Sequence, residues 1–368
     1  MANYIILPFL HYLMSFSEIL LNWYYINKRD LPWRSTNNIY FIWVSEIILQ
    51  QTRVEQGLSY YNKFIKNFPD IFSLANASEE NVLKTWQGLG YYTRARNMHA
   101  AAKQIVEDHN GIIPASYNEI IKIRGIGKYT AAAILSFGYN LPYPVLDGNV
   151  KRVVSRYFAI KNDISLPETE IKLRKKLDAL FDKNKPADFN QAIMEFGALY
   201  CKPGIPDCTN CIFKEKCKAF TEGKVMEIPF NPSKTKISQR FFYYVIPQCD
   251  KTKTTFTYLV KREKKDIWKN MFEFPLIELD HDSTIENFFK SSEFKKIFSG
   301  NSVKFISASQ VIVHKLSHQL IRARYIHIKI QKEINYPGFI KVLNNEFKNY
   351  PVSRLIEKYL KDENLFNL

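Results

Sequence analysis

The spacing of apolar positions changes once along the chain, near residue 224, and this change divides the sequence into two parts. From about residue 14 to residue 222 apolar residues recur every three or four positions, as in amphipathic helices joined by short loops. Typical helix starts are ASEENVLKTW (77–86), where Ser78 can cap the helix, and SYNEIIKI (116–123). The pattern therefore predicts a mainly α-helical first part.

The second part has the pattern of a mixed α+β domain. Aromatic and β-branched runs with partial alternation predict strands at RFFYYVIPQ, TTFTYLVKRE and RARYIHIKIQ. Residues 284–298 and 352–363 have helical spacing instead. Residues 224–238 carry two prolines and several lysines without periodicity, which is typical of a linker. We expect a helical region over residues 1–223, this linker, and an α+β domain over residues 239–368.

The amino-acid composition and net charge indicate which kind of partner the protein binds. The chain of 368 residues is 46% hydrophobic and 24% charged, as expected for a soluble globular protein. Its 52 Lys and Arg outnumber 36 Asp and Glu, and a net charge of +16 favours nucleic acid as partner. The lysines are spread evenly and no amphipathic anchor is evident, which disfavours a membrane surface. Residues 1–13 are apolar but interrupted and lack a positively charged leading segment, so we expect no signal peptide. The expected protein is a cytoplasmic, nucleoid-associated monomer.

Cysteines are concentrated in one short stretch. Four of the five lie in CKPGIPDCTNCIFKEKC (201–217), with gaps of six, two and five residues. In a reducing cytosol such a cluster indicates metal binding rather than disulfides. A single compact loop suits a [4Fe–4S] cluster held by four thiolates, whereas structural zinc usually takes two separated Cys pairs. Zinc and unliganded thiols remain the alternatives for these ligands: Cys201, Cys208, Cys211 and Cys217.

A glycine-rich turn precedes a predicted helix in IRGIGKYTAAAILSF (123–137). Gly125 and Gly127 flank one apolar residue, and the backbone N–H groups of such a turn, with the following helix N-terminus, can bind a phosphate. With the upstream helix, residues from about 116 to 137 form a helix–hairpin–helix pattern. A plain tight turn between two helices is the alternative.

Two carboxylates occupy unusual positions. Glu46 lies within an apolar helix, where burial should raise its pKa, as a general acid near neutral pH requires. The alternative is an ion pair with Arg34 or Arg53. Asp147 lies in a loop just before a helix and is suited to face developing positive charge, with Asn149 capping the helix. Alternatively, Asp147 is itself the helix cap.

These features together resemble the endonuclease III superfamily of DNA glycosylases and, within it, the adenine DNA glycosylases of the MutY type. The resemblance covers about residues 18–220, and the region after the linker matches more loosely, through DIWKNMFEFP (266–275) and HKLSHQ (314–319). The segments that carry it are DLPWR (30–34), WVSEIILQQTRV (43–54), WQGLGYYTRARN (86–97), GIGKYTAAAI (125–134), LDGNVKRV (146–153), FNQAIMEFGALYC (189–201) and the cysteine loop.

The resemblance implies excision of adenine mispaired with 8-oxoguanine or guanine in double-stranded DNA, with the adenine flipped into a pocket. It implies that Glu46 protonates N7 of adenine and that Asp147 stabilises the cationic sugar before water attacks it. It also implies a [4Fe–4S] cofactor. Further implied positions are Tyr129 and Asn149 beside the sugar, Arg34 and Gln191 near the adenine, and Leu49, Gln51, Thr52 and Tyr91 around the orphaned 8-oxoguanine.

The sequence differs from related enzymes in two features, and these refine the expected activity. Relatives that also cut the DNA backbone carry a lysine just before the hairpin-helix threonine, where this chain has Tyr129; Lys128 points about 100° away around the helix. We therefore expect a monofunctional glycosylase, with a bifunctional lyase as the first alternative and a non-catalytic DNA-binding module as the second. The C-terminal domain resembles the Nudix fold but lacks its glutamate-rich metal-binding motif, so it is expected to bind rather than hydrolyse.

In the family this domain recognises 8-oxoguanine through a Phe-Ser-His loop. Here Leu316 replaces the phenylalanine, and Ser317 and His318 can still form hydrogen bonds with a damaged purine. The alternative is that Ser317 and His318 only close a turn between strands.

Overall fold

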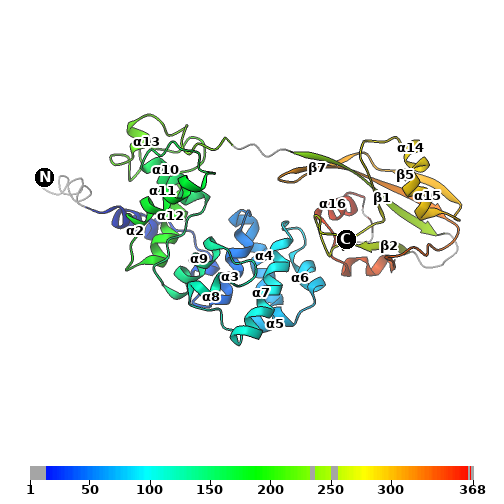
Figure 1. Cartoon of the computed structure of the whole chain (residues 1–368), viewed down its shortest axis with the longest axis horizontal. Helices are drawn as coiled ribbons and strands as arrows, with labels where there is room; N and C mark the ends of the chain where they lie inside the picture. Colours follow the sequence, from blue (N-terminus) through cyan, green and yellow to red (C-terminus); the bar gives the residue numbers. More distant parts are fainter. Residues whose placement is uncertain (1–13, 233–236, 250–255, 364, 366–368) are drawn as a thin grey trace. The chain divides into compact units, whose positions relative to one another are not determined.

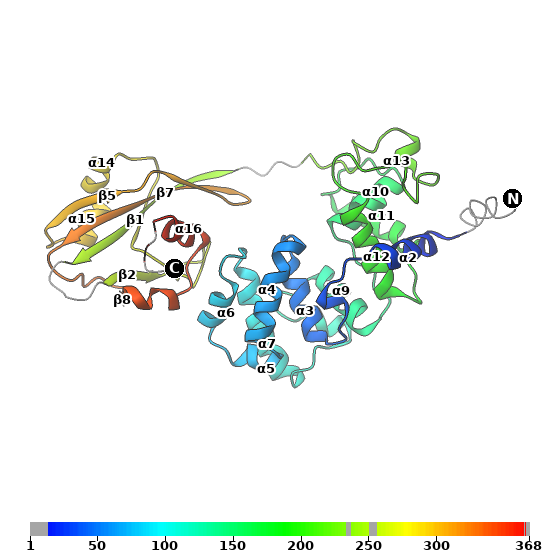
Figure 2. The same cartoon turned by 180° about the vertical axis from the view of Figure 1, so that it is seen from behind.

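The computed structural model describes residues 14–232, 237–249, 256–363 and 365. The chain divides into two compact units, one comprising residues up to Ala75 with Ala100–Ser233, the other Asn76–His99 with Lys234–Leu368 (Figures 1 and 2). The segment 76–99, which the sequence pattern assigns to the helical region, thus groups with the C-terminal domain. Residues 1–13 and part of the predicted linker lie outside the described residues. No helix in the described ranges has both the length and the apolar character needed to cross a bilayer.

The first part of the chain is helical, as predicted. Ser78 caps its helix by accepting a hydrogen bond from the backbone N–H of Asn81, whereas Ser116 makes no side-chain cap bond. The elements are α2 (Phe16–Asn27), η1 (Pro32–Arg34), α3 (Ile39–Leu49), α4 (Val54–Asn67), α5 (Ile71–Asn76), α6 (Glu79–Trp86), α7 (Thr93–His109), α8 (Tyr117–Ile120), α9 (Lys128–Tyr139), α10 (Gly148–Tyr157), α11 (Pro167–Asp178), α12 (Pro186–Leu199) and α13 (Lys218–Thr221).

Two groups of helices form the core of the first unit. Helix α3 is apolar around most of its circumference and packs against α4 and α9, with Trp43, Val44 and Ile48 fully buried. Helices α2, α10 and α12 pack around a second cluster that includes Leu20 and Phe189. Because α9 contacts both α3 and α12, it joins the two groups.

The C-terminal domain is α+β, as predicted. One sheet has the order β4-β1-β7-β5 with β6 paired to β7, and the other has the order β3-β2-β8. The long strands β1 and β7 pair in parallel, from Ser238 opposite Gln319 to Cys249 opposite Ile330. The elements are β1 (Ser238–Cys249), β2 (Phe256–Lys261), β3 (Phe272–Glu273), β4 (Leu276–Leu279), α14 (Ile285–Lys290), α15 (Ser292–Phe298), β5 (Val303–Ala308), β6 (Ile312–Lys315), β7 (Gln319–Ile330), β8 (Phe339–Leu343), η2 (Asn344–Asn349) and α16 (Arg354–Asp362).

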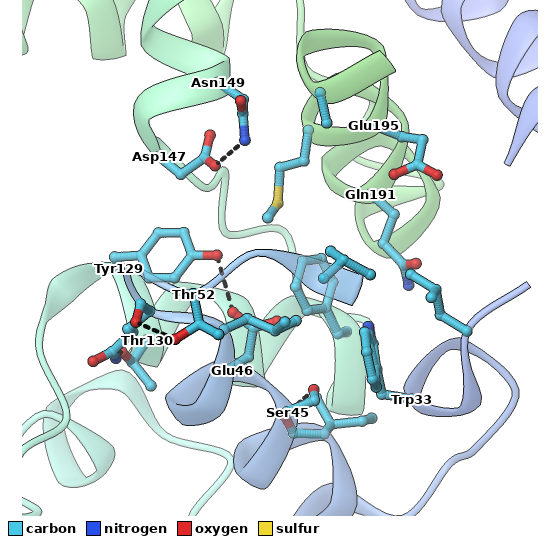
Figure 3. Close-up of a pocket in the computed structure, with 18 of the residues that line it drawn as sticks. Trp33, Ser45, Glu46, Thr52, Tyr129, Thr130, Asp147, Asn149, Gln191 and Glu195 are labelled. Carbon is cyan, nitrogen blue, oxygen red and sulfur yellow. Dashed lines mark hydrogen bonds between the residues drawn. The ribbon is translucent and has the colours of Figure 1, made fainter. Parts of the chain in front are cut away.

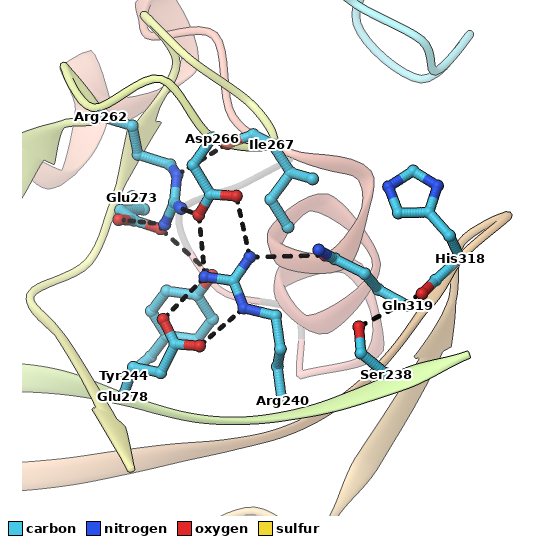
Figure 4. Close-up of polar contacts among 10 residues, drawn as sticks. All are labelled: Ser238, Arg240, Tyr244, Arg262, Asp266, Ile267, Glu273, Glu278, His318 and Gln319. Atoms are coloured by element: carbon cyan, nitrogen blue, oxygen red, sulfur yellow. Dashed lines mark hydrogen bonds and ion pairs between the residues drawn. The ribbon is translucent and has the colours of Figure 1, made fainter. Parts of the chain in front are cut away.

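An ion-pair network fixes the start of β7. Arg240 of β1 binds Asp266 at 2.8 Å and Glu278 at 2.6 Å, and its Nη1 atom also donates to Gln319 at 3.4 Å (Figure 4). Arg262 binds the same Asp266 carboxylate at 2.7 Å. Because these side chains are mostly shielded from water, the pairs are screened less than surface pairs. The network therefore anchors the base of the β6–β7 turn.

Segment 76–99 contacts the loops of the C-terminal domain within the second unit. Helix α6 and the start of α7 bind backbone carbonyls and side chains around residues 261–270 and 350–352. The contacts are Glu79 with Asn270 (2.5 Å), Glu80 with Lys261 (2.8 Å), Lys84 with the Tyr350 carbonyl (3.2 Å), Gln87 with the Val352 N–H (3.2 Å) and Arg96 with the Lys269 carbonyl (2.6 Å). These contacts fix the α6–α7 turn relative to the sheet of the same unit.

Candidate active site

A pocket of about 680 Å³ opens in the first unit, within the size range of ligand sites. It is lined by α3, α9, α12, the N-terminus of α10 and the segment around η1 (Figure 3). The structure brings together the candidate residues from these elements, which are far apart in sequence. They are Arg34, Glu46, Leu49, Gln51, Thr52, Gly125, Gly127, Tyr129, Asp147, Asn149 and Gln191.

Glu46 lies on α3 and is only 7% exposed. Its Oε2 atom accepts a hydrogen bond from the Tyr129 hydroxyl at 2.9 Å, and neither arginine considered as an ion-pair partner binds it in the described part of the chain. Burial raises the pKa of Glu46 to about 7; the charge of Asp147 adds to this shift, while Tyr129 and Arg34 oppose it. Near neutral pH a large fraction of Glu46 is therefore protonated and able to donate a proton.

Asp147, rather than Asn149, caps α10, which corrects the prediction for Asn149. Its backbone is extended, and its Oδ1 atom accepts the Val150 N–H at 2.7 Å. The Nδ2 atom of Asn149 donates to the other oxygen, Oδ2, at 2.9 Å. Burial raises the pKa of Asp147, and the hydrogen bonds from Val150 and Asn149 oppose this. Two hydrogen-bond donors thus stabilise the ionised form of Asp147, whereas Glu46 has one, the Tyr129 hydroxyl.

The amide of Asn149 is oriented by an arginine that the sequence interpretation did not include. Arg152 donates from Nη2 to Asn149 Oδ1 at 2.9 Å and to the Gly197 carbonyl at 2.7 Å. With its oxygen bound in this way, the Asn149 amide directs its nitrogen at Asp147. Arg152 also donates from Nε to the Cys201 carbonyl at 2.8 Å. The side chain therefore connects the pocket wall to the start of the cysteine loop.

Helix α12 contributes a second buried carboxylate. Gln191 and Glu195 are four residues apart and share the helix face that lines the pocket (Figure 3). Gln191 accepts a hydrogen bond from the Tyr24 hydroxyl at 3.0 Å, and Glu195 binds Arg29 and Arg34. The sequence interpretation missed Glu195, although it carries the same signal as Glu46, a carboxylate within an apolar helical run.

The end of α3 forms part of the pocket rim. The helix ends at Leu49, and Gln51 has a left-handed backbone with φ of 57°, which is uncommon for a residue other than glycine. The Thr52 N–H bonds the Leu49 carbonyl at 3.2 Å and closes this turn. Gln50 donates to the Thr130 hydroxyl at 3.2 Å. Side chains on both sides of the turn are thereby presented at the opening of the pocket.

The predicted hairpin turn leads directly into α9. Gly125 has a φ of 78°, which favours glycine, and the Ile126 N–H bonds the Ile123 carbonyl at 3.1 Å. Gly127 is the N-cap residue of α9, and no side chain caps the helix. The first-turn N–H groups of α9 are thus free of a side-chain cap, as a backbone phosphate site requires. Lys128 is exposed next to the half-buried Tyr129.

The four cysteines of the 201–217 loop line one small pocket next to α10 and α12. They form no disulfide. Arg156 directs Nη1 at the Cys201 sulfur at 3.5 Å, and the Phe213 N–H points at the Cys211 sulfur at 3.4 Å. Donors of this kind are typical around metal-bound thiolates. Among the described residues, no group of three or more His, Cys, Asp or Glu is arranged to hold a single metal ion.

The remaining candidates lie in the second unit. Tyr91 is 51% exposed in the α6–α7 turn and has a φ of 49°. Its hydroxyl lies 2.9 Å from the Ser317 hydroxyl. Ser317 and His318 are exposed and form the turn between β6 and β7, which the Leu316 N–H closes by donating to the Gln319 carbonyl at 2.8 Å. The alternative of a strand turn thus describes their backbone, while both side chains remain accessible.

Comparisons with known proteins agree with this geometry. A model of the HhH-GPD superfamily of base excision DNA repair proteins matches residues 44–179. An adenine DNA glycosylase of Buchnera aphidicola subsp. Baizongia pistaciae is 37% identical over 359 residues, which cover 95% of this chain and 97% of that protein. The human adenine DNA glycosylase is 39% identical over 214 residues, covering 56% of this chain and 39% of that protein. The structure of a thermostable thymine-DNA glycosylase matches with a TM-score of 0.52 at 27% identity, over 56% of this chain and 95% of that one.

Proposed function

The chain belongs to the adenine DNA glycosylases of the HhH-GPD superfamily, and we propose that it excises adenine mispaired with 8-oxoguanine or guanine by base flipping, as a monofunctional enzyme. As a member of this family it hydrolyses the N-glycosidic bond of adenine in base excision repair. The observation that carries the proposal is that Glu46 and Asp147 line one pocket in different environments: Glu46 accepts one hydroxyl, whereas Asp147 accepts a backbone N–H and a side-chain amide.

Glu46 acts as the general acid in this proposal. Adenine inside a duplex is inaccessible, so the nucleotide is turned out into the pocket. Glu46 then donates its proton to N7 of adenine, and the glycosidic bond breaks with both electrons moving to the base. Its raised pKa, about 7, matches this task near neutral pH.

Asp147 stabilises the sugar that remains. The cleaved sugar resembles an oxocarbenium ion, and the carboxylate lowers its energy electrostatically in a water-poor site. Water adds to the anomeric carbon and releases a proton, which restores the Glu46 carboxyl group. Asn149 holds Asp147 in place, Tyr129 orients Glu46, and Arg34 and Gln191 contact the adenine edge from the adjoining wall.

The absence of a suitable lysine supports a monofunctional enzyme. Tyr129 occupies the position of the lyase nucleophile and donates its hydroxyl to Glu46. Lys128 is exposed at the start of α9. Borohydride trapping should therefore give little covalent enzyme–DNA adduct, whereas a strong adduct that Lys128→Ala abolishes would establish the bifunctional alternative.

Contacts with DNA are assigned to several surfaces. The N–H groups around Gly125 and Gly127 bind a phosphate without reading sequence, and the net charge of +16 supports nonspecific attraction. Tyr91 inserts into the base stack at the lesion, as an exposed aromatic on a glycine-rich turn can. Leu49, Gln51 and Thr52 of the pocket rim are proposed to contact the orphaned 8-oxoguanine. For Ser317 and His318 of the C-terminal domain we propose hydrogen bonds to a damaged purine.

We assign a [4Fe–4S] cluster to the four cysteines of the 201–217 loop. All four line one pocket, and N–H donors point at two of the sulfurs, which fits four thiolates around a polynuclear cluster. A cluster gives each thiolate its own iron, so its ligands stand farther apart than those of one zinc ion. The bound group would fold the loop and present Lys202, Lys214 and Lys216 to phosphates. We further propose that the enzyme acts as a monomer on cytoplasmic DNA.

Single-turnover excision assays test the function directly. Duplexes with adenine opposite 8-oxoguanine, guanine or thymine are compared for wild type and Glu46→Gln. We expect rapid excision opposite 8-oxoguanine, slower excision opposite guanine, none opposite thymine, and a strong loss in the variant. If wild type and variant were equally inactive while both bound DNA, the alternative of a non-catalytic binding module would be correct.

A further inference from the structure

Glu195 forms a buried ion-pair group on the pocket wall. Its side chain is 1% exposed and binds two arginines through both oxygens. Arg29 donates from Nε at 2.9 Å and from Nη2 at 2.7 Å, and its backbone N–H donates at 2.9 Å. Arg34 donates from Nη1 at 3.0 Å and from Nη2 at 2.8 Å. This carboxylate thus has a full set of charge-assisted partners.

The ion-pair group leaves an excess of one positive charge at the pocket. Burial by itself would raise the pKa of Glu195, but the hydrogen bonds and charges of Arg29 and Arg34 outweigh it and lower the pKa to about 2. Glu195 is therefore ionised throughout the physiological range. One carboxylate offsets one of the two guanidinium charges, and the exposed Glu55 lies 3.8 Å from Arg29. Arg34 faces Glu46, where its positive charge favours the ionised acid.

We propose that Glu195 is a positioning residue of adenine excision, which holds Arg34 against the pocket wall and offsets its charge so that Glu46 remains protonated. The inference rests on the proposed role of Glu46 as the acid. Gln191 lies one helical turn away on the same face, so the same helix also fixes the adenine-facing amide. Glu195 itself makes its contacts with the two arginines rather than with substrate.

The charged and titratable groups around Glu46 fix the sign of the effect. Tyr129 faces it from α9, Asp147 from the N-cap of α10, and Arg34 from η1. Of these groups, Arg34 alone is cationic, and its charge is offset by Glu195. A neutral residue at position 195 leaves Arg34 without its carboxylate and Arg29 with only the exposed Glu55, so the ionised form of Glu46 gains stability. Excision then requires a lower pH to keep Glu46 protonated.

The pH dependence of the single-turnover excision rate on an adenine:8-oxoguanine duplex tests this inference. In wild type we expect the rate to fall as the pH rises through about 7, the pKa of Glu46. In Glu195→Gln we expect the fall in rate at alkaline pH to shift to lower pH by about one unit, the effect of one uncompensated charge several ångströms away at the effective dielectric of a protein site. Glu195→Asp keeps the charge and is the matched control, in which the fall should stay near its wild-type position.

Arg34→Gln provides an independent variant in which Glu195 keeps Arg29 as partner. Removing this cation should move the alkaline fall to higher pH, opposite to Glu195→Gln, whatever happens to the maximal rate. Thermal melting checks that each variant is folded at the assay temperature, and if Glu195→Gln is unfolded, an unchanged pH dependence in Arg34→Gln still overturns the inference.

A fall that stays at the wild-type pH in every folded variant, with rates lowered equally at all pH values, would show a purely structural role and overturn the inference. The failure of the proposed function looks different. In that case wild type itself would show no alkaline fall, or Glu46→Gln would keep full activity.

Discussion

At the scale of single residues, the site depends on two carboxyl groups made different by their surroundings. Glu46 is buried and accepts one hydroxyl, whereas Asp147 accepts a backbone N–H and an amide. The charge of Asp147 raises the pKa of Glu46 further, because two neighbouring anions repel each other. Different pKa values in one pocket allow one group to act as acid and the other as anion.

The raised pKa of Glu46 also predicts that this carboxyl group lowers the free energy of unfolding. Its pKa is about 7 in the folded protein, against the ordinary glutamate value of 4.5 in the unfolded chain. The free energy of unfolding therefore falls as the pH rises from about 4.5 to 7, and the loss stays constant at higher pH. We expect Glu46→Gln to abolish excision while raising the free energy of unfolding by about 3 kcal/mol above neutral pH, and by less at acid pH. Denaturant unfolding at several pH values measures this, and a gain independent of pH would contradict it.

Substitutions of Asp147 should separate its two roles. Asp147→Asn keeps an oxygen that can accept the Val150 N–H but loses the charge and the acceptor of Asn149, so we expect a stability loss of about 1 kcal/mol and an excision rate at least ~100-fold lower. Asp147→Ala also loses the helix cap and should cost about 1 kcal/mol more. Melting curves and single-turnover rates on the same preparations compare the two. Full activity in Asp147→Asn would exclude an electrostatic role.

Individual residues also show which parts of the site could be predicted from the sequence and which could not. Glu46 stands out locally because, apart from Ser45, the residues around it on the helix are apolar. The partners of Glu195 lie 161 and 166 positions away along the chain, so no local pattern indicates them. The cap of α10 was wrongly given to Asn149, because both residues are good cap formers and only the backbone geometry at Asp147 decides between them.

At the scale of elements, apolar periodicity predicted the helices and the long strands, because it reports directly which faces are buried. It did not find the break at Ser291, which accepts the Phe294 N–H and starts α15 one residue after α14 ends. Nor did it indicate that β1 pairs in parallel with β7, a strand some 80 residues later. Strand pairing depends on the packing of the whole sheet rather than on either segment alone.

The cysteine loop is the element on which a metal prediction can be tested. Iron analysis of protein purified without oxygen should give about four iron atoms per chain together with visible absorbance, while zinc would give about one metal atom and no colour. Cys208→Ser should lose iron, colour and thermal stability. Cys249→Ser, outside the loop, is the control and should keep all three. Normal iron content in Cys208→Ser would remove that residue from the ligand set.

At the scale of the whole molecule, the division of the chain was harder to predict than its elements. Segment 76–99 is helical and adjoins other helices in sequence, yet it groups with the C-terminal domain through Glu80, Gln87 and Arg96. These contacts are polar pairs between distant stretches, which leave no periodic signal. As a result, the turn that carries Tyr91 is hydrogen-bonded to the domain that carries Ser317.

The hydrogen bond between Tyr91 and Ser317 predicts that lesion recognition is shared between the two turns. If the bond orders both hydroxyls before DNA binds, Tyr91→Phe and Ser317→Ala should each reduce the preference for 8-oxoguanine over guanine opposite adenine by about fivefold, the value of one neutral hydrogen bond. Tyr91→Phe keeps the aromatic ring, so insertion into the stack is preserved. Because either change removes the same bond, the double variant should lose little more of this preference than each single variant does. Single-turnover rates on the two duplexes, analysed as a double-mutant cycle, measure this. Fully additive losses would mean that the two hydroxyls contact DNA independently.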